Sequence, residues 1–129
     1  MAKVAFLVVT KIVVVEEKST RRIHRGSTEQ EARAFAAEGA HVVIAEYNET
    51  TGASVARSLK DQGYKALFIK TDVSKPEQCR AMVDQTLKEF RRVDVLVNNA
   101  GINVFHDPLS MPEDEWKRCF AVDLEGVWH

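Results

Sequence analysis

Apolar and polar positions alternate along the chain in blocks that predict short buried strands separated by amphipathic helices. The strands are expected where Val, Ile, Leu, Phe and Ala dominate, at residues 4–9, 41–46, 66–69 and 93–98. The first strand either ends there, continues or turns back through residues 12–15. Apolar residues three and four positions apart predict helices at about 28–38, 51–62 and 74–90, and a last helix that opens at 111–116.

This alternation of strands and helices indicates the α/β class. Strands joined by helical connections form right-handed crossovers and pair in parallel. We therefore expect a Rossmann-like, doubly wound parallel sheet that is truncated after its fourth strand and the following helix. A chain of 129 residues is long enough to bury a core and short enough to be a single domain.

Local signals support the predicted helices. Thr28 and Glu31 have the spacing of a capping box, which predicts that a helix begins near Thr28. Ser74 followed by Pro76 predicts a second helix start, with the serine as the cap. This helix carries an apolar stripe that we expect to be core rather than a site, formed by Cys79, Met82, Val83, Thr86, Leu87 and Phe90.

Composition and charge exclude several classes of protein. The net charge is −1, so no overall basic field would attract nucleic acid. The apolar run at residues 4–15 is interrupted by Lys11 and is too short to span a bilayer. Cys79 and Cys119 match no disulfide framework or zinc motif, so we expect a soluble, cytoplasmic protein. The histidines lack ligand spacing, and no metal site is predicted at His24, His41, His106 or His129.

The candidate chemistry lies at the carboxyl ends of the predicted strands, where parallel α/β sheets bind ligands. Glu46 ends the second strand, where an acid suits a ribose 2′-hydroxyl and repels a 2′-phosphate; the alternative is an exposed strand-end charge. Asp72 follows the third strand and either accepts a hydrogen bond from an adenine amino group or only begins a turn. The fourth strand ends in a loop formed by Asn98, Asn99, Ala100 and Gly101. Its small residues would allow close approach of a ligand; the alternative is an ordinary turn between strand and helix.

Four landmarks in order make residues 32–129 resemble the amino-terminal half of a short-chain dehydrogenase/reductase. They are residues 34–46 around the second strand, 71–74, 98–101 and 116–127. The resemblance implies hydride transfer between a nicotinamide dinucleotide and an alcohol or carbonyl, with NAD favoured over NADP. It also implies cofactor-binding roles for Glu46, Tyr47, Asp72 and Val73, and for Asn98, Asn99, Ala100 and Gly101.

Both ends of the chain depart from the family pattern, and residues 1–31 are atypical. The glycine-rich turn TGxxxGxG, whose amides cradle the pyrophosphate, is absent after Thr10. The catalytic Tyr-x-x-x-Lys is absent as well, since neither Tyr47 nor Tyr64 has a lysine four residues on. The helix position that is often Asn in the family is Asp123. No residue is therefore predicted to be catalytic.

These observations favour a partial short-chain dehydrogenase/reductase that is inactive by itself and does not necessarily bind its cofactor. The alternative is a non-catalytic module that binds a nucleotide or a partner through the retained strand ends. A further interpretation is self-association through the sheet edge and helix face that the fourth strand leaves uncovered.

Overall fold

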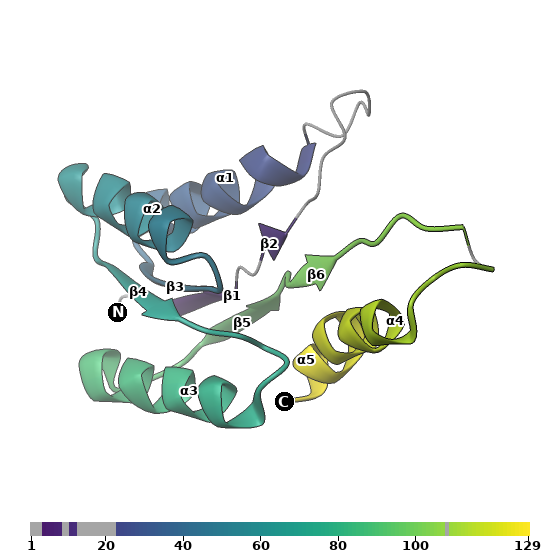
Figure 1. The fold of residues 1–129 in the computed structure, drawn as a ribbon. Helices are drawn as coiled ribbons and strands as arrows, with labels where there is room; N and C mark the ends of the chain where they lie inside the picture. Colours follow the sequence, from purple (N-terminus) through teal and green to yellow (C-terminus); the bar gives the residue numbers. More distant parts are fainter. Residues whose placement is uncertain (1–3, 9–10, 13–22, 108) are drawn as a thin grey trace.

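The computed structural model describes residues 4–8, 11–12, 23–107 and 109–129. Its main sheet has four parallel strands in the order β4-β3-β1-β5, which confirms the predicted fold class (Figure 1). The strands are β1 (Val4–Val8), β3 (His41–Glu46), β4 (Ala66–Lys70) and β5 (Val95–Asn98).

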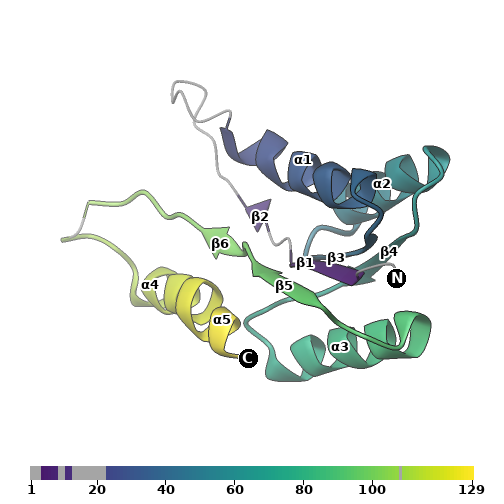
Figure 2. The same cartoon turned by 180° about the vertical axis from the view of Figure 1, so that it is seen from behind.

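The connections wind the sheet in two directions from β1. The chain moves outward through α1 (Ile23–Ala37), β3, α2 (Glu49–Asp61) and β4, and α3 (Pro76–Phe90) then leads back to β5 on the other side of β1. Helices α1 and α2 cover one face of the sheet, and α3 lies with the C-terminal helices on the other (Figures 1 and 2). The topological switch point of the sheet is therefore at β1.

Strand β3 is the centre of the core, because its side chains supply both faces of the sheet. Val43 and Ala45 belong to the cluster under α3, whereas Val42 and Ile44 belong to the cluster under α1 and α2. This division follows from the two-residue period of a strand. A strand buried on both faces has a continuous apolar sequence, which is why residues 41–46 were predictable.

Two predicted helix starts are wrong. Helix α1 begins at Ile23, so Thr28 lies inside it and does not cap it. The stretch before Thr28 contains no proline, and Gly26 alone costs only about 1 kcal/mol in a helix, so the helix extends past the capping-box signal. Helix α3 has Pro76 in its first turn as predicted, but its cap is Lys75. The Ser74 hydroxyl instead donates to Asp72 Oδ1 at 2.6 Å.

The predicted apolar stripe of α3 is only partly core. Cys79, Met82 and Thr86 are buried, whereas Val83 and Leu87 are 38% and 41% exposed. Only one face of α3 packs on the sheet, so the flanking apolar positions remain open. The predicted start of the fourth strand also shifts, because the pairing of β5 with β1 begins at Val95.

Two features of the fold were not predicted, a small second sheet and a π-helical turn in the last helix. Strand β2 (Lys11–Ile12) pairs in parallel with β6 (Gly101–Ile102) and forms a small second sheet. The last helix begins at Glu113, and its middle is a π-helical turn; the parts are α4 (Glu113–Phe120), η1 (Ala121–Glu125) and α5 (Gly126–Trp128). Residues 13–15 and the glycine-poor segment that replaces the family's turn lie mostly outside the described residues.

Candidate functional site

The carboxyl ends of the parallel strands meet at one edge of the sheet. Val8 at the end of β1 is in register with Ala45 of β3 on one side and with Asn98 of β5 on the other. Neighbouring strands are about 4.8 Å apart, so the ends of β3 and β5 are roughly 10 Å apart. The predicted residues therefore share one edge, and an elongated ligand can span it.

Glu46 is a buried carboxylate at this edge, with 1% of the residue exposed. The alternative interpretation of Glu46, an exposed strand-end charge, is therefore excluded. Its Oε1 accepts a hydrogen bond from the Asn48 N–H at 2.8 Å, and Asn48 Oδ1 in turn caps α2 by accepting from the Thr51 N–H at 3.1 Å. Glu46 thus fixes the turn between β3 and α2, and the glycine at position 52 lets α2 pack against it.

Asp72 is engaged in a turn. Its Oδ1 accepts from both the N–H and the hydroxyl of Ser74, at 3.0 and 2.6 Å, and its own N–H donates to Gln78 Oε1 at 2.8 Å. This is the turn-forming arrangement expected of an aspartate that precedes a helix. Tyr47, the residue after Glu46, is 47% exposed.

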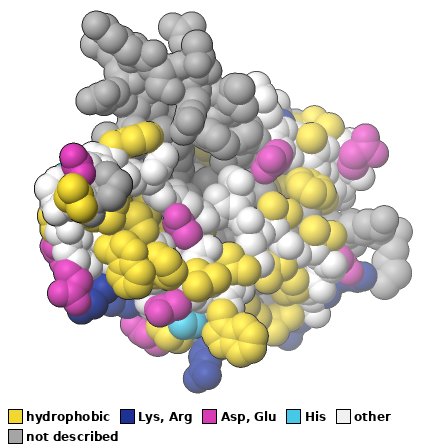
Figure 3. Space-filling model, turned by 90° about the vertical axis from the view of Figure 1, so that its right-hand side faces the viewer, with side chains coloured by type: hydrophobic (Ala, Val, Ile, Leu, Met, Phe, Trp, Pro, Cys, Tyr) yellow, Lys and Arg dark blue, Asp and Glu magenta, His cyan; other side chains and the backbone are white. Residues whose placement is uncertain are grey.

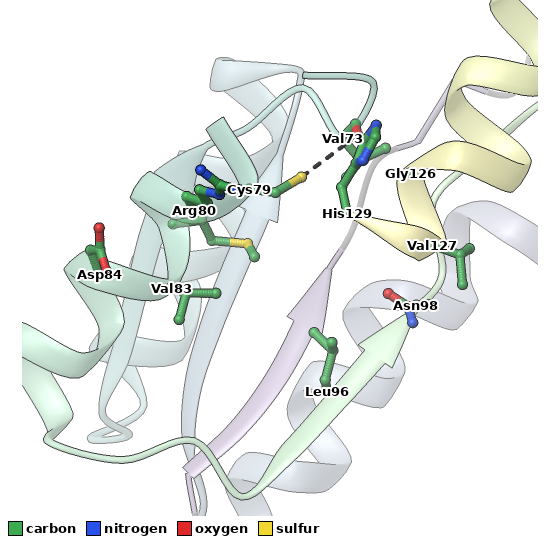
Figure 4. A pocket seen from close by; sticks show the side chains of 11 residues that line it. Val73, Cys79, Arg80, Val83, Asp84, Leu96, Asn98, Gly126, Val127 and His129 are labelled. Atoms are coloured by element: carbon green, nitrogen blue, oxygen red, sulfur yellow. Dashed lines mark hydrogen bonds between the residues drawn. The ribbon is translucent and has the colours of Figure 1, made fainter. Parts of the chain in front are cut away.

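Asn98, the last residue of β5, borders a cavity of about 270 Å³ between α3 and α5. Figure 4 shows Asn98 and Leu96 of β5 on one side of this cavity and Cys79 and Val83 of α3 on the other. Ala100 packs against the buried cluster beneath the same helix, and Asn99 is exposed.

The predicted side chains therefore emerge on opposite faces of the sheet. Asn98 is in the same register row as Ala45, which faces α3, and Glu46 follows one residue later and faces α2. Val73 also lies on the α3 face. The structure brings the strand ends together but separates the Glu46 and Asn98 side chains, so a ligand that reaches both must lie across the edge of the sheet.

The helix position of interest, Asp123, contacts the chain that follows the loop. Its Oδ1 accepts a hydrogen bond from the Ile102 N–H at 2.8 Å. Sequence reasoning missed the ion pair of Glu115 with His106 and the approach of the Val104 backbone to the Cys119 thiol. The available signal was the four-residue spacing of Glu115, Cys119 and Asp123, which places them on one face of a helix.

Among the described residues, no group of three or more His, Cys, Asp or Glu side chains could hold a metal ion. In the same described part of the chain, no helix is both long and apolar enough to cross a membrane.

The sequence matches the profile of the short chain dehydrogenases over residues 24–129. This match covers most of the chain. The protein belongs to the short-chain dehydrogenase family. A short chain dehydrogenase/reductase of Aspergillus oryzae is 42% identical over 104 residues, which cover 79% of this chain and 40% of that relative.

Solved structures of short-chain dehydrogenases have the same fold. A member from Burkholderia phymatum in complex with NAD gives a TM-score of 0.81 at 26% identity, over 98% of this chain and 41% of that one. A gluconate 5-dehydrogenase from Burkholderia cenocepacia in complex with NADP and tartrate gives 0.76 at 30% identity, over 99% and 46%. This short-chain dehydrogenase chain thus spans about 40% of the curated relative named above, and less than half of these two structures.

Proposed function

We propose that the chain belongs to an NAD(P)-dependent oxidoreductase of alcohol or carbonyl substrates and supplies its dinucleotide-binding half. The bound nicotinamide would supply the hydride acceptor or donor. The observation that carries the proposal is the gathering of Glu46, Asp72 and the loop at Asn98 at one sheet edge, beside the switch point at β1. Relatives of known structure that bind NAD or NADP support it.

In this proposal the ends of β3 and β4 bind the adenosine half of the cofactor. Glu46 accepts from a ribose hydroxyl, Tyr47 borders it, and Asp72 and Val73 flank adenine. A carboxylate repels a 2′-phosphate, so NAD binds better than NADP. Because only 1% of Glu46 is exposed, a ribose hydroxyl reaches it only after the covering side chains move. The loop residues Asn98, Asn99, Ala100 and Gly101 line the rest of the dinucleotide.

We further propose that this chain alone has no turnover. Neither tyrosine has a lysine four residues on, so no paired group is available to protonate a carbonyl. Asp123, at the position that is often Asn in the family, bonds to the Ile102 backbone instead of standing free for proton transfer.

A fluorescence titration of the full chain with NADH and NADPH tests the binding site. We expect saturable NADH binding that is tighter than NADPH binding. Glu46→Gln keeps an acceptor oxygen for the Asn48 N–H but removes the charge, so the preference for NADH should shrink several-fold or disappear. The matched control is Glu89→Gln, because this exposed residue near the end of α3 lies at the opposite, amino edge of the sheet.

The outcomes separate the possibilities clearly. No saturable binding of either dinucleotide would overturn the binding proposal. Equal preferences in wild type and Glu46→Gln would overturn the role of Glu46. NADH oxidation above the blank with a panel of carbonyl compounds would overturn the proposed inactivity.

An exposed apolar face supports a second role, association with another copy of the chain. Trp116, Phe120, Leu124 and Trp128 lie four residues apart along the C-terminal helix and are 43–89% exposed. We call them the α4–α5 stripe. Figure 3 looks onto this side of the molecule, where apolar side chains gather between scattered charges. The outer edge of β5 adds to this surface, since β5 is the last strand of the described sheet.

Sedimentation velocity over a range of concentrations tests this second role. We expect a concentration-dependent dimer that Leu124→Lys shifts to monomer. Leu87→Lys, on an exposed position of α3, is the matched control and should leave the dimer unchanged. A wild-type chain that stays monomeric at all concentrations would overturn self-association.

A further inference from the structure

Three side chains on one face of the C-terminal helix lie along alternate residues of the segment 102–106, which begins at the last residue of β6. Asp123 Oδ1 accepts from the Ile102 N–H at 2.8 Å, and the Val104 backbone lies close enough to the Cys119 thiol to oppose the rise of its pKa. The third contact joins Glu115 Oε2 to His106 Nε2 at 2.7 Å. The helix residues are 4 apart and their partners are 2 apart, running in the opposite direction.

The two spacings match because of elementary backbone geometry. Eight residues of an α-helix rise about 12 Å, and four residues of an extended chain rise about 13 Å. A helix face at i, i+4 and i+8 can therefore follow alternate positions of an antiparallel extended segment. In Figures 1 and 2 the chain leaving β6 runs beside α4.

Burial marks two of the three helix positions. Glu115 and Cys119 are half-buried, whereas Asp123 and the neighbours Trp116 and Lys117 are exposed. Burial and the nearby Asp123 carboxylate raise the pKa of the Cys119 thiol, so it stays protonated and uncharged at neutral pH. The Asp123 carboxylate is a stronger acceptor for a backbone N–H than the neutral Cys119 thiol.

We propose that Glu115, Cys119 and Asp123 form a clasp that positions residues 102–106 and, through them, the loop at Asn98–Gly101 for dinucleotide binding. The proposal rests on the proposed function. Ile102 is the first residue held by the clasp, and it lies next to Gly101, the last residue of that loop. The same two residues form β6, which pairs with Lys11 and Ile12 of β2. The clasp thus fixes one end of the loop from outside, while β5 fixes the other end within the sheet.

Two measurements on the full chain test the clasp. The first is NMR hydrogen exchange of the Ile102 and Val104 amides, and the second is the NADH titration. Asp123→Ala should raise the exchange rate at Ile102 at least tenfold and weaken NADH binding several-fold. Asp123→Asn keeps an acceptor oxygen and should restore both. Asp114→Ala removes an exposed carboxylate of the same helix and is the matched control.

Each outcome decides a separate point. Unchanged exchange at Ile102 in Asp123→Ala would overturn the clasp. Faster exchange with unchanged NADH affinity would overturn its positioning role. Loss of the cooperative thermal transition in Asp123→Ala would show that this variant does not fold. In that case hydrogen exchange of the Val104 amide is compared between Cys119→Ser and Cys119→Ala, and equal rates in the two variants would overturn the clasp. If wild type binds no NADH, the positioning role fails with the proposed function, whereas the exchange result alone still accepts or rejects the clasp.

Discussion

Strands β3 and β5 flank the same central strand, yet their surroundings are opposite. Five of the six residues of β3 are buried, whereas none of the four residues of β5 is buried and three are exposed. Their sequences, HVVIAE and VLVN, are both apolar and end in a polar residue. An apolar run therefore predicts a parallel strand, and the neighbours of that strand decide how much of it is buried.

The neighbours differ in two ways. Strand β3 lies between β1 and β4, with α1 and α2 on one face and α3 on the other. Strand β5 is at the edge of the described sheet, and a cavity between α3 and α5 lies over it. Stability should thus be concentrated around β3, and the flank around β5 should tolerate substitution.

The largest difference in the free energy of unfolding is expected when one apolar side chain is truncated on β3 and one on β5. Ile44 is 1% exposed and Leu96 is 53% exposed. Ile44→Ala leaves a cavity in the core and should lower the free energy of unfolding by about 2–5 kcal/mol. Leu96→Ala should lower it by less than about 1 kcal/mol. Urea unfolding followed by circular dichroism measures both, and equal losses would mean that β5 is covered in solution.

Replacing a glycine by alanine on each flank should give a smaller difference in the free energy of unfolding. A Cβ at Gly52 would lie 2.3 Å from Phe68 Cε2 and 2.9 Å from Glu46 Cβ, and one at Gly126 would lie 2.7 Å from Val73 Cγ2. Overpacking at Gly52 costs about 1–3 kcal/mol, offset by about 1 kcal/mol of helix propensity. Gly126→Ala should cost less, because the short α5 beside the cavity can move outward. A larger loss at Gly126 in the same urea assay would refute this ranking.

Removing one polar surface contact on each flank should give the smallest difference in stability. Asn48→Ala removes the cap of α2 on the β3 flank and should cost about 1 kcal/mol. Ser110→Ala removes an exposed hydrogen bond to the Asp107 carbonyl beyond β6 and should cost less than about 0.5 kcal/mol. Thermal unfolding distinguishes them as a lower midpoint for Asn48→Ala alone. Equal midpoints would show that the cap adds nothing to the β3 flank.

Much of the fold was predictable because the apolar periods of strand and helix differ. The bounds of β3 matched the prediction, and α2 begins two residues before the predicted start because Asn48, rather than a later residue, caps it. The start of α1 was not predictable from Thr28 and Glu31, since a capping-box spacing also occurs inside helices. The β2–β6 pair was not predictable either, because two residues carry no periodic signal.

For the candidate site, the sequence predicted which strand ends share an edge but not the environment of each side chain. The burial of Glu46 depends on how α2 packs, and the turn of Asp72 depends on Ser74 giving up its predicted capping role. That Glu46 and Asn98 face opposite ways follows from pairing register, which no local pattern specifies.

The π-helical turn η1 acts like a one-residue insertion that the helix absorbs within a single turn. If this turn were straightened to an α-helix with no residue removed, the chain beyond it would change phase by about 100°. Glu125 would then take the place of Gly126 against Val73, where even a Cβ lies too close. Deleting one residue from η1 instead would keep Gly126 in phase. The close contact of Gly126 with Val73 therefore favours the π-helical turn over a regular α-helical one. Deletion of one residue should be tolerated better within η1 than elsewhere in this helix.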